Sequence, residues 1–249
     1  MQGVPILRLV ATMLVLTAII SVIMLIPNWN GEQASTAADD IDRLLDVMIV
    51  LSSFVFSIVI VMLGYALLKW RAKAGDESDG EPIHGNTRLE IAWTLIPTVI
   101  VMFAAVYSWI VLSDIEAREP DRMVINVNSQ QYEWSFQYPA QGAVLTHELH
   151  VPVNRQLELK MHARDVIHSF WVPEWRIKKD NVPGITTRAI VTPDKVGTYQ
   201  LICTELCGYG HSTMRAKVVV EPEAKFQSWI ATQEPAGGST PAPPGGGAT

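Results

Sequence analysis

The stretch Cys203-Thr-Glu-Leu-Cys-Gly-Tyr-Gly-His-Ser-Thr-Met214 places two thiols, one imidazole and one thioether within twelve residues, and it holds both cysteines of the chain. A thiolate is a metal ligand as well as a nucleophile, so two thiols this close together indicate a chemical role. A disulfide would suit an oxidising compartment, but it would give no role to His211 and Met214. The alternatives are a structural zinc site and a copper site.

The residue types in this stretch favour copper. Zinc would take Cys203, Cys207 and His211 with one distant histidine, but it has little use for a thioether such as that of Met214. Copper accepts thiolate, imidazole and a weak axial methionine together. A mononuclear copper loop of this kind needs only one cysteine, whereas two thiolates can bridge two metal ions. We therefore predict a binuclear copper site.

A binuclear site needs a second imidazole from outside this stretch. The candidates are His84, His147, His150, His162 and His168. A single histidine on a strand is usually a surface or hydrogen-bonded residue, and we expect this of His147, His150 and His162. His168 differs because apolar and aromatic residues surround it, and Pro173 ends its segment. This setting suits a shielded ligand at the end of a strand.

Four segments together resemble the CuA domain of subunit II of haem-copper cytochrome c oxidases, in order and in spacing. They are Asp165-Val-Ile-His-Ser-Phe-Trp-Val-Pro173, Lys179-Asp-Asn-Val-Pro-Gly184, Gly197-Thr-Tyr199 and Cys203-x-Glu-x-Cys-Gly-x-x-His-x-x-Met214. The resemblance covers roughly residues 40–230, and the copper stretch is its most specific part.

The resemblance implies a ligand set for two copper ions. It comprises the bridging thiolates of Cys203 and Cys207, the imidazoles of His168 and His211, the thioether of Met214 and the backbone carbonyl of Glu205. The Glu205 carboxylate would also reach a magnesium ion shared with the catalytic subunit. The alternative for that carboxylate is a plain acidic loop residue.

The resemblance also implies a function, namely that of subunit II in a proton-pumping cytochrome c oxidase. Cytochrome c would deliver electrons to the copper centre outside the membrane of a bacterium. The centre would pass them to haem in catalytic subunit I, where oxygen becomes water, with subunit III as a further partner. One alternative is a quinol oxidase subunit, which lacks the copper ligands. Others are a membrane-anchored copper carrier or sensor, and nitrous oxide reductase, which has a similar copper loop but against which the membrane helices here argue.

Composition indicates a membrane part joined to a soluble part. Of the 249 residues, 49% are hydrophobic while 18% are charged. Residues 1–113 carry 10 acidic and 6 basic side chains, and residues 114–231 carry 14 and 13. The second part is therefore nearly neutral, and nothing in the charge pattern indicates a nucleic-acid partner.

Three uncharged runs are long enough to cross the ~30 Å core of a lipid bilayer. They are Leu9–Ile26, Val47–Leu68 and Ile91–Ser113. The first is longer than the apolar core of a usual signal peptide, so we favour a retained helix over a cleaved signal. Lys69, Arg71 and Lys73 place the end of the second run in the cytoplasm. The C-terminal part is then outside.

Glu90 lies where the third run begins, and it has two interpretations. An acid in the first turn of a helix is favoured by the helix dipole. A titratable residue at a membrane boundary is also a functional candidate. By resemblance, the matching glutamate lies at the mouth of a proton-uptake path.

From Met123 the apolar residues recur with a period of two, in short runs separated by Pro or Gly. This pattern predicts a β-sandwich or barrel, and by resemblance a cupredoxin-like Greek-key sandwich. The predicted fold class is thus membrane-anchored helices followed by an all-β domain. We divide the chain into a first hydrophobic segment (1–27), a helical hairpin (28–120, helices about 45–69 and 88–113), the CuA domain (121–231) and a disordered tail (232–249).

The aromatic stretch Gln131-Tyr-Glu-Trp-Ser-Phe-Gln-Tyr138 reads, taken alone, as strand and core. Relatives usually have Gln-Trp-x-Trp here, and their first tryptophan receives the electron from cytochrome c. Tyr132 occupies that place in this chain, and Trp134 keeps the second. Because the domain is nearly neutral and Tyr132 differs, we expect a donor that docks by apolar contacts or is tethered nearby, such as a membrane-bound cytochrome c or one in a supercomplex.

Overall fold

A computed structural model describes residues 5–72, 74–75, 82 and 84–233. The chain forms two compact units, which are treated separately below. The helical unit comprises Met1–Trp29 and Asp42–Val111, and the β unit comprises Asn30–Ile41 and Leu112–Thr249. Residues 234–249, which make up most of the predicted tail, lie outside the described part of the chain.

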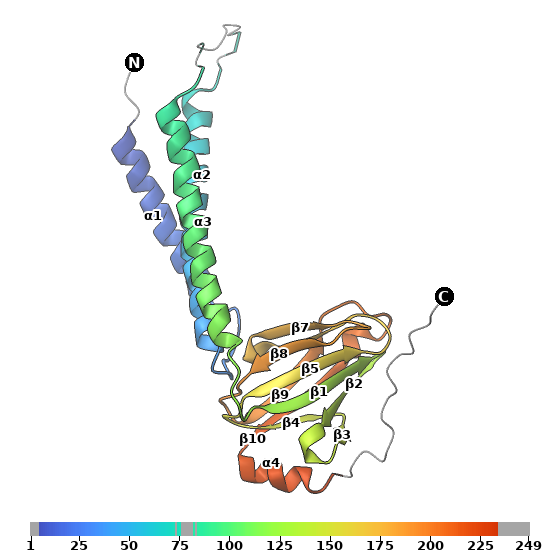
Figure 1. Ribbon diagram of the computed structural model, residues 1–249. Helices are drawn as coiled ribbons and strands as arrows, with labels where there is room; N and C mark the ends of the chain where they lie inside the picture. Colours follow the sequence, from blue (N-terminus) through green and yellow to red (C-terminus); the bar gives the residue numbers. More distant parts are fainter. Residues whose placement is uncertain (1–4, 73, 76–81, 83, 234–249) are drawn as a thin grey trace. The chain divides into compact units, whose positions relative to one another are not determined.

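Three long apolar helices are found in the described residues (Figure 1). They are α1 (Ile6–Leu25), α2 (Ala38–Lys69) and α3 (Thr87–Ile115), and an 18-residue stretch within each has a mean hydropathy of 2.5, 2.7 and 2.3, respectively. At 1.5 Å per residue, even the 20 residues of α1 reach across a bilayer core. Their buried residues include Ser21, Ser53 and Ser57, and small side chains of this kind allow membrane helices to approach closely.

The second membrane helix begins earlier than expected. The sequence predicted a start near residue 45, after a polar connector, but α2 begins at Ala38. Asp39 and Asp40 lie in its first turn, where the helix dipole favours acidic side chains. Asp39 and Asp40 therefore belong to the helix rather than to the segment before it.

The connector that precedes α2 packs on the β unit. Ser35 pairs with Pro193 in an isolated β-bridge, and its hydroxyl donates to the carbonyl of Trp175 (2.9 Å). The N–H of Ala34 donates to the carbonyl of Glu174 (2.8 Å). Residues 30–41, which we had grouped with the helical hairpin, thus belong structurally to the β unit.

The β unit is a sandwich of two five-stranded sheets followed by a short helix, α4 (Glu223–Ile230) (Figure 1). The first sheet has the order β3 (Val144–Thr146), β2 (Glu133–Tyr138), β1 (Met123–Gln130), β5 (Leu157–Ala163), β8 (Thr187–Val191). The second has the order β4 (Leu149–Pro152), β10 (Arg215–Glu221), β9 (Gly197–Cys203), β6 (His168–Val172), β7 (Ile177–Asn181). The chain changes sheet repeatedly, as in a Greek key, so the predicted cupredoxin-like sandwich is confirmed.

The apolar residues that recur with a period of two in the sequence are the ones that form the core of the β unit. On β1, Met123, Ile125 and Val127 are buried, and the residues between them are only partly covered. Parallel pairing sets Ile125 beside Leu159 and Val127 beside Met161 of β5. Apolar side chains of both strands therefore point to the same inner face.

Strand register brings the metal-binding segments to one end of the second sheet. β6 begins at His168, and its antiparallel neighbour β9 ends at Cys203, with Phe170 opposite Cys203. β10 begins directly after Met214, and the N–H of Cys203 donates to the carbonyl of Met214 (3.1 Å). Residues 204–214 are thus a loop closed at its base by the two strands that flank it.

Candidate metal centre

The two cysteines form a close, buried pair of thiols. Their Sγ atoms lie 3.8 Å apart, and each residue is 3% exposed. A disulfide requires about 2.05 Å, so the two residues are free cysteines here. Burial, together with the neighbouring Cys203, raises the pKa of the Cys207 thiol to about 11. A cation entering this cluster would therefore displace thiol protons.

Each sulfur has its own imidazole. His168 Nδ1 lies 3.9 Å from Cys203 Sγ, and His211 Nδ1 lies 3.6 Å from Cys207 Sγ. His168 is completely buried at the start of β6, while His211 begins a short 3₁₀ turn in the loop. The second imidazole expected from outside the copper stretch is thus in contact range of the thiols.

Two weaker donors complete the cluster, one on each side. Met214 Sδ lies 3.8 Å from Cys207 Sγ, and its side chain is fully buried. The carbonyl oxygen of Glu205 lies 3.4 Å from Cys203 Sγ. The six donors therefore form two similar halves around the thiol pair. One half holds Cys203, His168 and the Glu205 carbonyl, and the other holds Cys207, His211 and Met214. Such a set suits two soft metal ions better than one tetrahedral zinc ion.

His147, His150 and His162 make their contacts elsewhere in the β unit. His150 is stacked on Trp229 of α4, with ring centroids 3.9 Å apart, and contacts Glu221 at 3.1 Å. His147 bonds the carbonyl of Trp134, and His162 lies near the hydroxyl of Thr186.

Asp165 fixes the orientation of the buried imidazole. His168 Nε2 donates to its carboxylate (2.8 Å), which leaves Nδ1 facing the thiols. Burial by itself would raise the pKa of Asp165, but the hydrogen bonds from His168 and from the backbone N–H groups of Gln131 and Val166 lower it. A carboxylate behind a histidine is a common way to orient a metal ligand. Asp165 begins the segment Asp165–Pro173, but the sequence alone indicated no role for it.

The two candidate electron-entry residues contact different parts of this arrangement. Trp134 is 2% exposed, and its ring centroid is 6.3 Å from that of His168. Tyr132 is 40% exposed and lies against the loop, where a Cβ added at Gly210 would come within 2.5 Å of its Cγ. The sequence did not single out Gln131, whose side-chain Nε2 donates to the carbonyl of Cys207 (2.6 Å). In the sequence, the only sign of a role for Gln131 is its position directly before Tyr132.

Glu90 lies in the first turn of α3 and is exposed within its unit. Its carboxylate accepts a hydrogen bond from the N–H of Asn86 (3.2 Å), while the Asn86 side chain accepts one from Leu89 (3.2 Å). This reciprocal cap supports the helix-end interpretation. Its role in a proton path stays a prediction.

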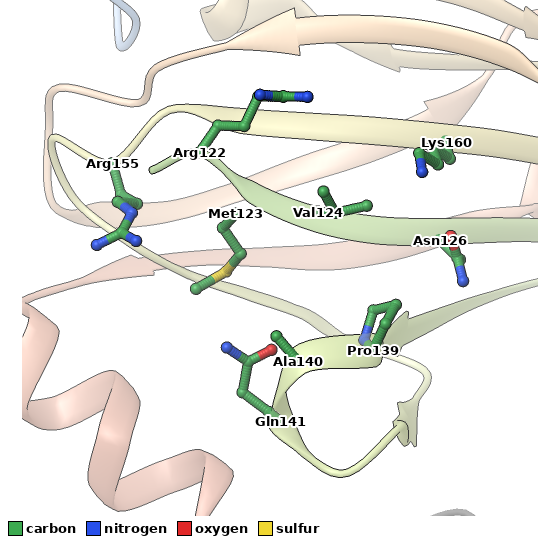
Figure 2. Close-up of a pocket in the computed structure, with 9 residues that line it drawn as sticks. All are labelled: Arg122, Met123, Val124, Asn126, Pro139, Ala140, Gln141, Arg155 and Lys160. Carbon is green, nitrogen blue, oxygen red and sulfur yellow. The ribbon is translucent and has the colours of Figure 1, made fainter. Parts of the chain in front are cut away.

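A groove of about 610 Å³ lies beside the first half of β1, away from the metal ligands. Its basic residues are Arg122, Arg155 and Lys160. Figure 2 shows these three side chains pointing in different directions. Arg122 is also paired with Glu158 (2.6 Å). The groove therefore offers no group of cations that converges on one anion.

Comparison with known proteins relates both units to one family. Residues 28–111 match the family model "Cytochrome C oxidase subunit II, transmembrane domain", and residues 143–222 match "Cytochrome C oxidase subunit II, periplasmic domain". Cytochrome c oxidase subunit 2 of Thermostichus vulcanus is 33% identical over 84% of this chain and 81% of its own length. Quinol oxidase subunit 2 of Bacillus subtilis is 29% identical over 71% of this chain and 57% of its own. The crystal structure of the periplasmic domain of subunit II of cytochrome oxidase (CoxB) of Bradyrhizobium japonicum is 28% identical, covering 46% of this chain and 94% of that one, with a TM-score of 0.44.

The fold and the donor cluster define a class: a membrane-spanning protein whose extracytoplasmic, cupredoxin-like domain presents a thiol-rich metal site. Within that class, the chain belongs to the cytochrome c oxidase subunit II family, a component of haem-copper oxidases.

Proposed function

We propose that this chain is the electron-accepting subunit II of a proton-pumping cytochrome c oxidase in the plasma membrane of a bacterium. The supporting observation is the arrangement of six donors in two similar halves around one thiol pair. A quinol oxidase subunit would need no such cluster. Family membership alone does not separate the two, because relatives of both names match this chain.

The residues of the cluster fit a binuclear CuA centre. Cys203 and Cys207 would bridge two copper ions, His168 and His211 would each bind one, and Met214 and the Glu205 carbonyl would be weak ligands. The copper pair, when bound, stores and releases single electrons. The protein supplies a dry and rigid cage, because the thiols, His168 and Met214 are all buried. Fixed ligands lessen the rearrangement that accompanies electron transfer.

The surroundings of the cluster suggest the route of the electron. Cytochrome c would dock over Tyr132 on the extracytoplasmic side and deliver one electron at a time. The electron would continue to haem in catalytic subunit I, which holds the oxygen-reducing site and also contacts subunit III. Glu205 is exposed, so its carboxylate is free to face a magnesium ion at the boundary with subunit I.

Metal analysis of the full-length chain tests this proposal. Purified in detergent with copper, it should be purple and hold two copper ions. Electron paramagnetic resonance should show one unpaired electron coupled to both copper nuclei. A colourless protein with one zinc ion per chain under copper-replete conditions would refute the proposal. A single copper ion that cannot be reduced by cytochrome c would indicate a carrier or sensor.

A further inference from the structure

Gln131 joins the electron-entry turn to both halves of the candidate metal centre. It lies between β1 and β2, directly before Tyr132. Its side-chain Nε2 donates to the carbonyl oxygen of Cys207 (2.6 Å). Its backbone N–H donates to the Asp165 carboxylate (2.6 Å), which in turn holds His168 Nε2. Gln131 is therefore linked by hydrogen bonds to the backbone of Cys207 and, through Asp165, to the imidazole of His168 in the other half.

The metal loop is shaped to let this turn approach closely. A Cβ added at Gly208 would lie 2.6 Å from the Tyr132 hydroxyl oxygen and 2.9 Å from Gln131 Nε2. Gly208 also has a φ of +123°, a conformation that disfavours other residues. A Cβ at Gly210 would collide with the Tyr132 ring. The tyrosine ring and the glutamine amide thus lie directly against the backbone of the loop.

These contacts define a short connection from the protein surface to the thiol pair. It runs along the side chain of Gln131, crosses one hydrogen bond to the Cys207 carbonyl, and continues through Cα and Cβ of Cys207 to its sulfur. Electronic coupling decays less steeply through covalent bonds and short hydrogen bonds than through open space. The alternative route through Trp134 ends at the edge of the His168 ring, with centroids 6.3 Å apart and no hydrogen bond between the two rings in the described structure.

We propose that Gln131 is a positioning residue that couples an electron arriving at Tyr132 to the Cys207 thiolate through its amide–carbonyl hydrogen bond. The proposal rests on the electron-accepting function described above. One electron passes from a reduced c-type cytochrome to the oxidised copper pair, and no bond to the protein is made or broken. Gln131 carries no charge and binds no metal.

The test uses the assembled oxidase with the full chain and saturating reduced cytochrome c, so that electron entry is a first-order step within the bound complex. Gln131→Met keeps the length of the side chain and removes the N–H donor. Gln131→Lys restores an N–H donor on a chain long enough to reach the carbonyl. Gln130→Met is the matched control, because Gln130 bonds Glu133 and Arg164 rather than the loop.

Gln131→Met should slow the first-order step by about tenfold, which is less than the roughly hundredfold that a 1 Å misplacement at a reacting site can cost. Copper content and the paramagnetic resonance spectrum should stay as in the wild type. Gln131→Lys should recover most of the rate, and Gln130→Met should leave it unchanged.

Three outcomes would overturn the proposal. One is an unchanged first-order rate in Gln131→Met, and another is a change confined to the second-order association rate. The third is loss of copper or an altered spectrum, which would make Gln131 a structural support of the loop. Failure of the proposed function would appear separately, as a wild-type protein without the two-copper spectrum.

Discussion

The sulfur atoms of the cluster occupy different places in it. Cys203 Sγ faces the other thiol, His168 and the Glu205 carbonyl, at distances between 3.4 and 3.9 Å. Met214 Sδ lies 3.8 Å from Cys207 Sγ, in the half that contains His211. A change at Cys203 should therefore affect both metal positions, whereas a change at Met214 should affect one.

Cys203→Ser should abolish the binuclear centre, because it removes a ligand shared by two copper ions. Met214→Leu nearly preserves the buried volume and removes only a weak ligand, so both copper ions should remain with a shifted reduction potential. Copper content and redox titration of the two variants provide the measurement. Equal loss of copper in both would contradict the proposal that Met214 is a weak ligand.

The buried carboxylate of Glu158 should make the stability of the β unit depend on pH. It is buried on β5, and the hydrogen bond from Arg122 lowers its pKa below the ordinary value of 4.5, although burial opposes this. Because the pKa of Glu158 is lower in the folded than in the unfolded chain, its carboxylate stabilises the fold fully above pH 4.5. This stabilisation is lost as the pH falls through the folded-state pKa. Glu158→Gln should lower the melting temperature at pH 7 by about 3 °C.

The same difference between wild type and Glu158→Gln should shrink as the pH falls below 4.5, because the carboxylate is protonated first in the unfolded chain and only at a lower pH in the folded one. Glu223→Gln, at an exposed position on α4, is the control and should change little at any pH. A difference that stays constant from pH 7 to pH 3.5 would show that the charge of Glu158 does not matter.

Glu90 offers a test of proton uptake. Glu90→Gln keeps an oxygen that can accept the hydrogen bond from Asn86 but cannot carry the proton. If Glu90 feeds protons to the catalytic subunit from the cytoplasm, oxygen reduction by the whole oxidase should slow severalfold. Electron transfer from cytochrome c to the copper centre should keep its rate. Unchanged turnover across pH would leave Glu90 with its capping role alone.

Among the larger elements, the segment before α2 and the first turn of that helix have an unexpected structural role. Residues 30–41 add a backbone bridge and several hydrogen bonds to the β unit, and Ser35 and Trp175 are both buried where they meet. A β domain produced from residue 112 onward would lack this segment. It should therefore be less stable than the same domain within the whole chain.

Ser35→Ala should destabilise the β unit by about 1 kcal/mol, because it leaves the buried carbonyl of Trp175 without its hydroxyl donor. Thermal unfolding of the full-length protein, followed by the signal of the β unit, measures this. Ser228→Ala is a matched control, since Ser228 is exposed on α4 and bonds only a carbonyl of its own helix. Equal effects of the two substitutions would contradict a supporting role for the connector.

Across the whole molecule, charge and apolar surface are distributed unevenly. Residues 114–231 are nearly neutral, with 14 acidic and 13 basic side chains. Beside the metal loop, Tyr132 is 40% exposed, Leu206 is 79% exposed and Tyr209 is fully exposed. Steering by charge needs a clearly charged surface, and it fades with salt. This face is therefore better suited to apolar docking.

The bimolecular rate of cytochrome c oxidation should fall by no more than about threefold as ionic strength rises through the physiological range, because strong steering is absent. Tyr132→Ala should slow the reaction more than neutralising any one surface acid. Stopped-flow kinetics at several salt concentrations give the measurement. A steep fall in the rate would reveal a strongly acidic docking face.

The sequence by itself determined the features that depend on neighbours along the chain. The spacing of Cys203, Cys207, His211 and Met214 defined most of the donor set, because one closed loop holds them. Long apolar runs marked the membrane helices, and a period of two marked the inner faces of the strands. Each of these signals lies within a single element, where local geometry sets which side chains share a face.

Only the tertiary structure decided how distant segments support that loop. The bond from Gln131 to Cys207 joins residues 76 positions apart, and the bond from Ser35 to Trp175 joins residues 140 apart. Glutamine and serine are common on surfaces, and nothing in their local sequence distinguishes a partner from a solvent-exposed residue. Sheet register brings the end of β1, the start of β6 and the end of β9 to the same end of the sandwich. Because of that register, Gln131 lies between the protein surface and the thiol pair.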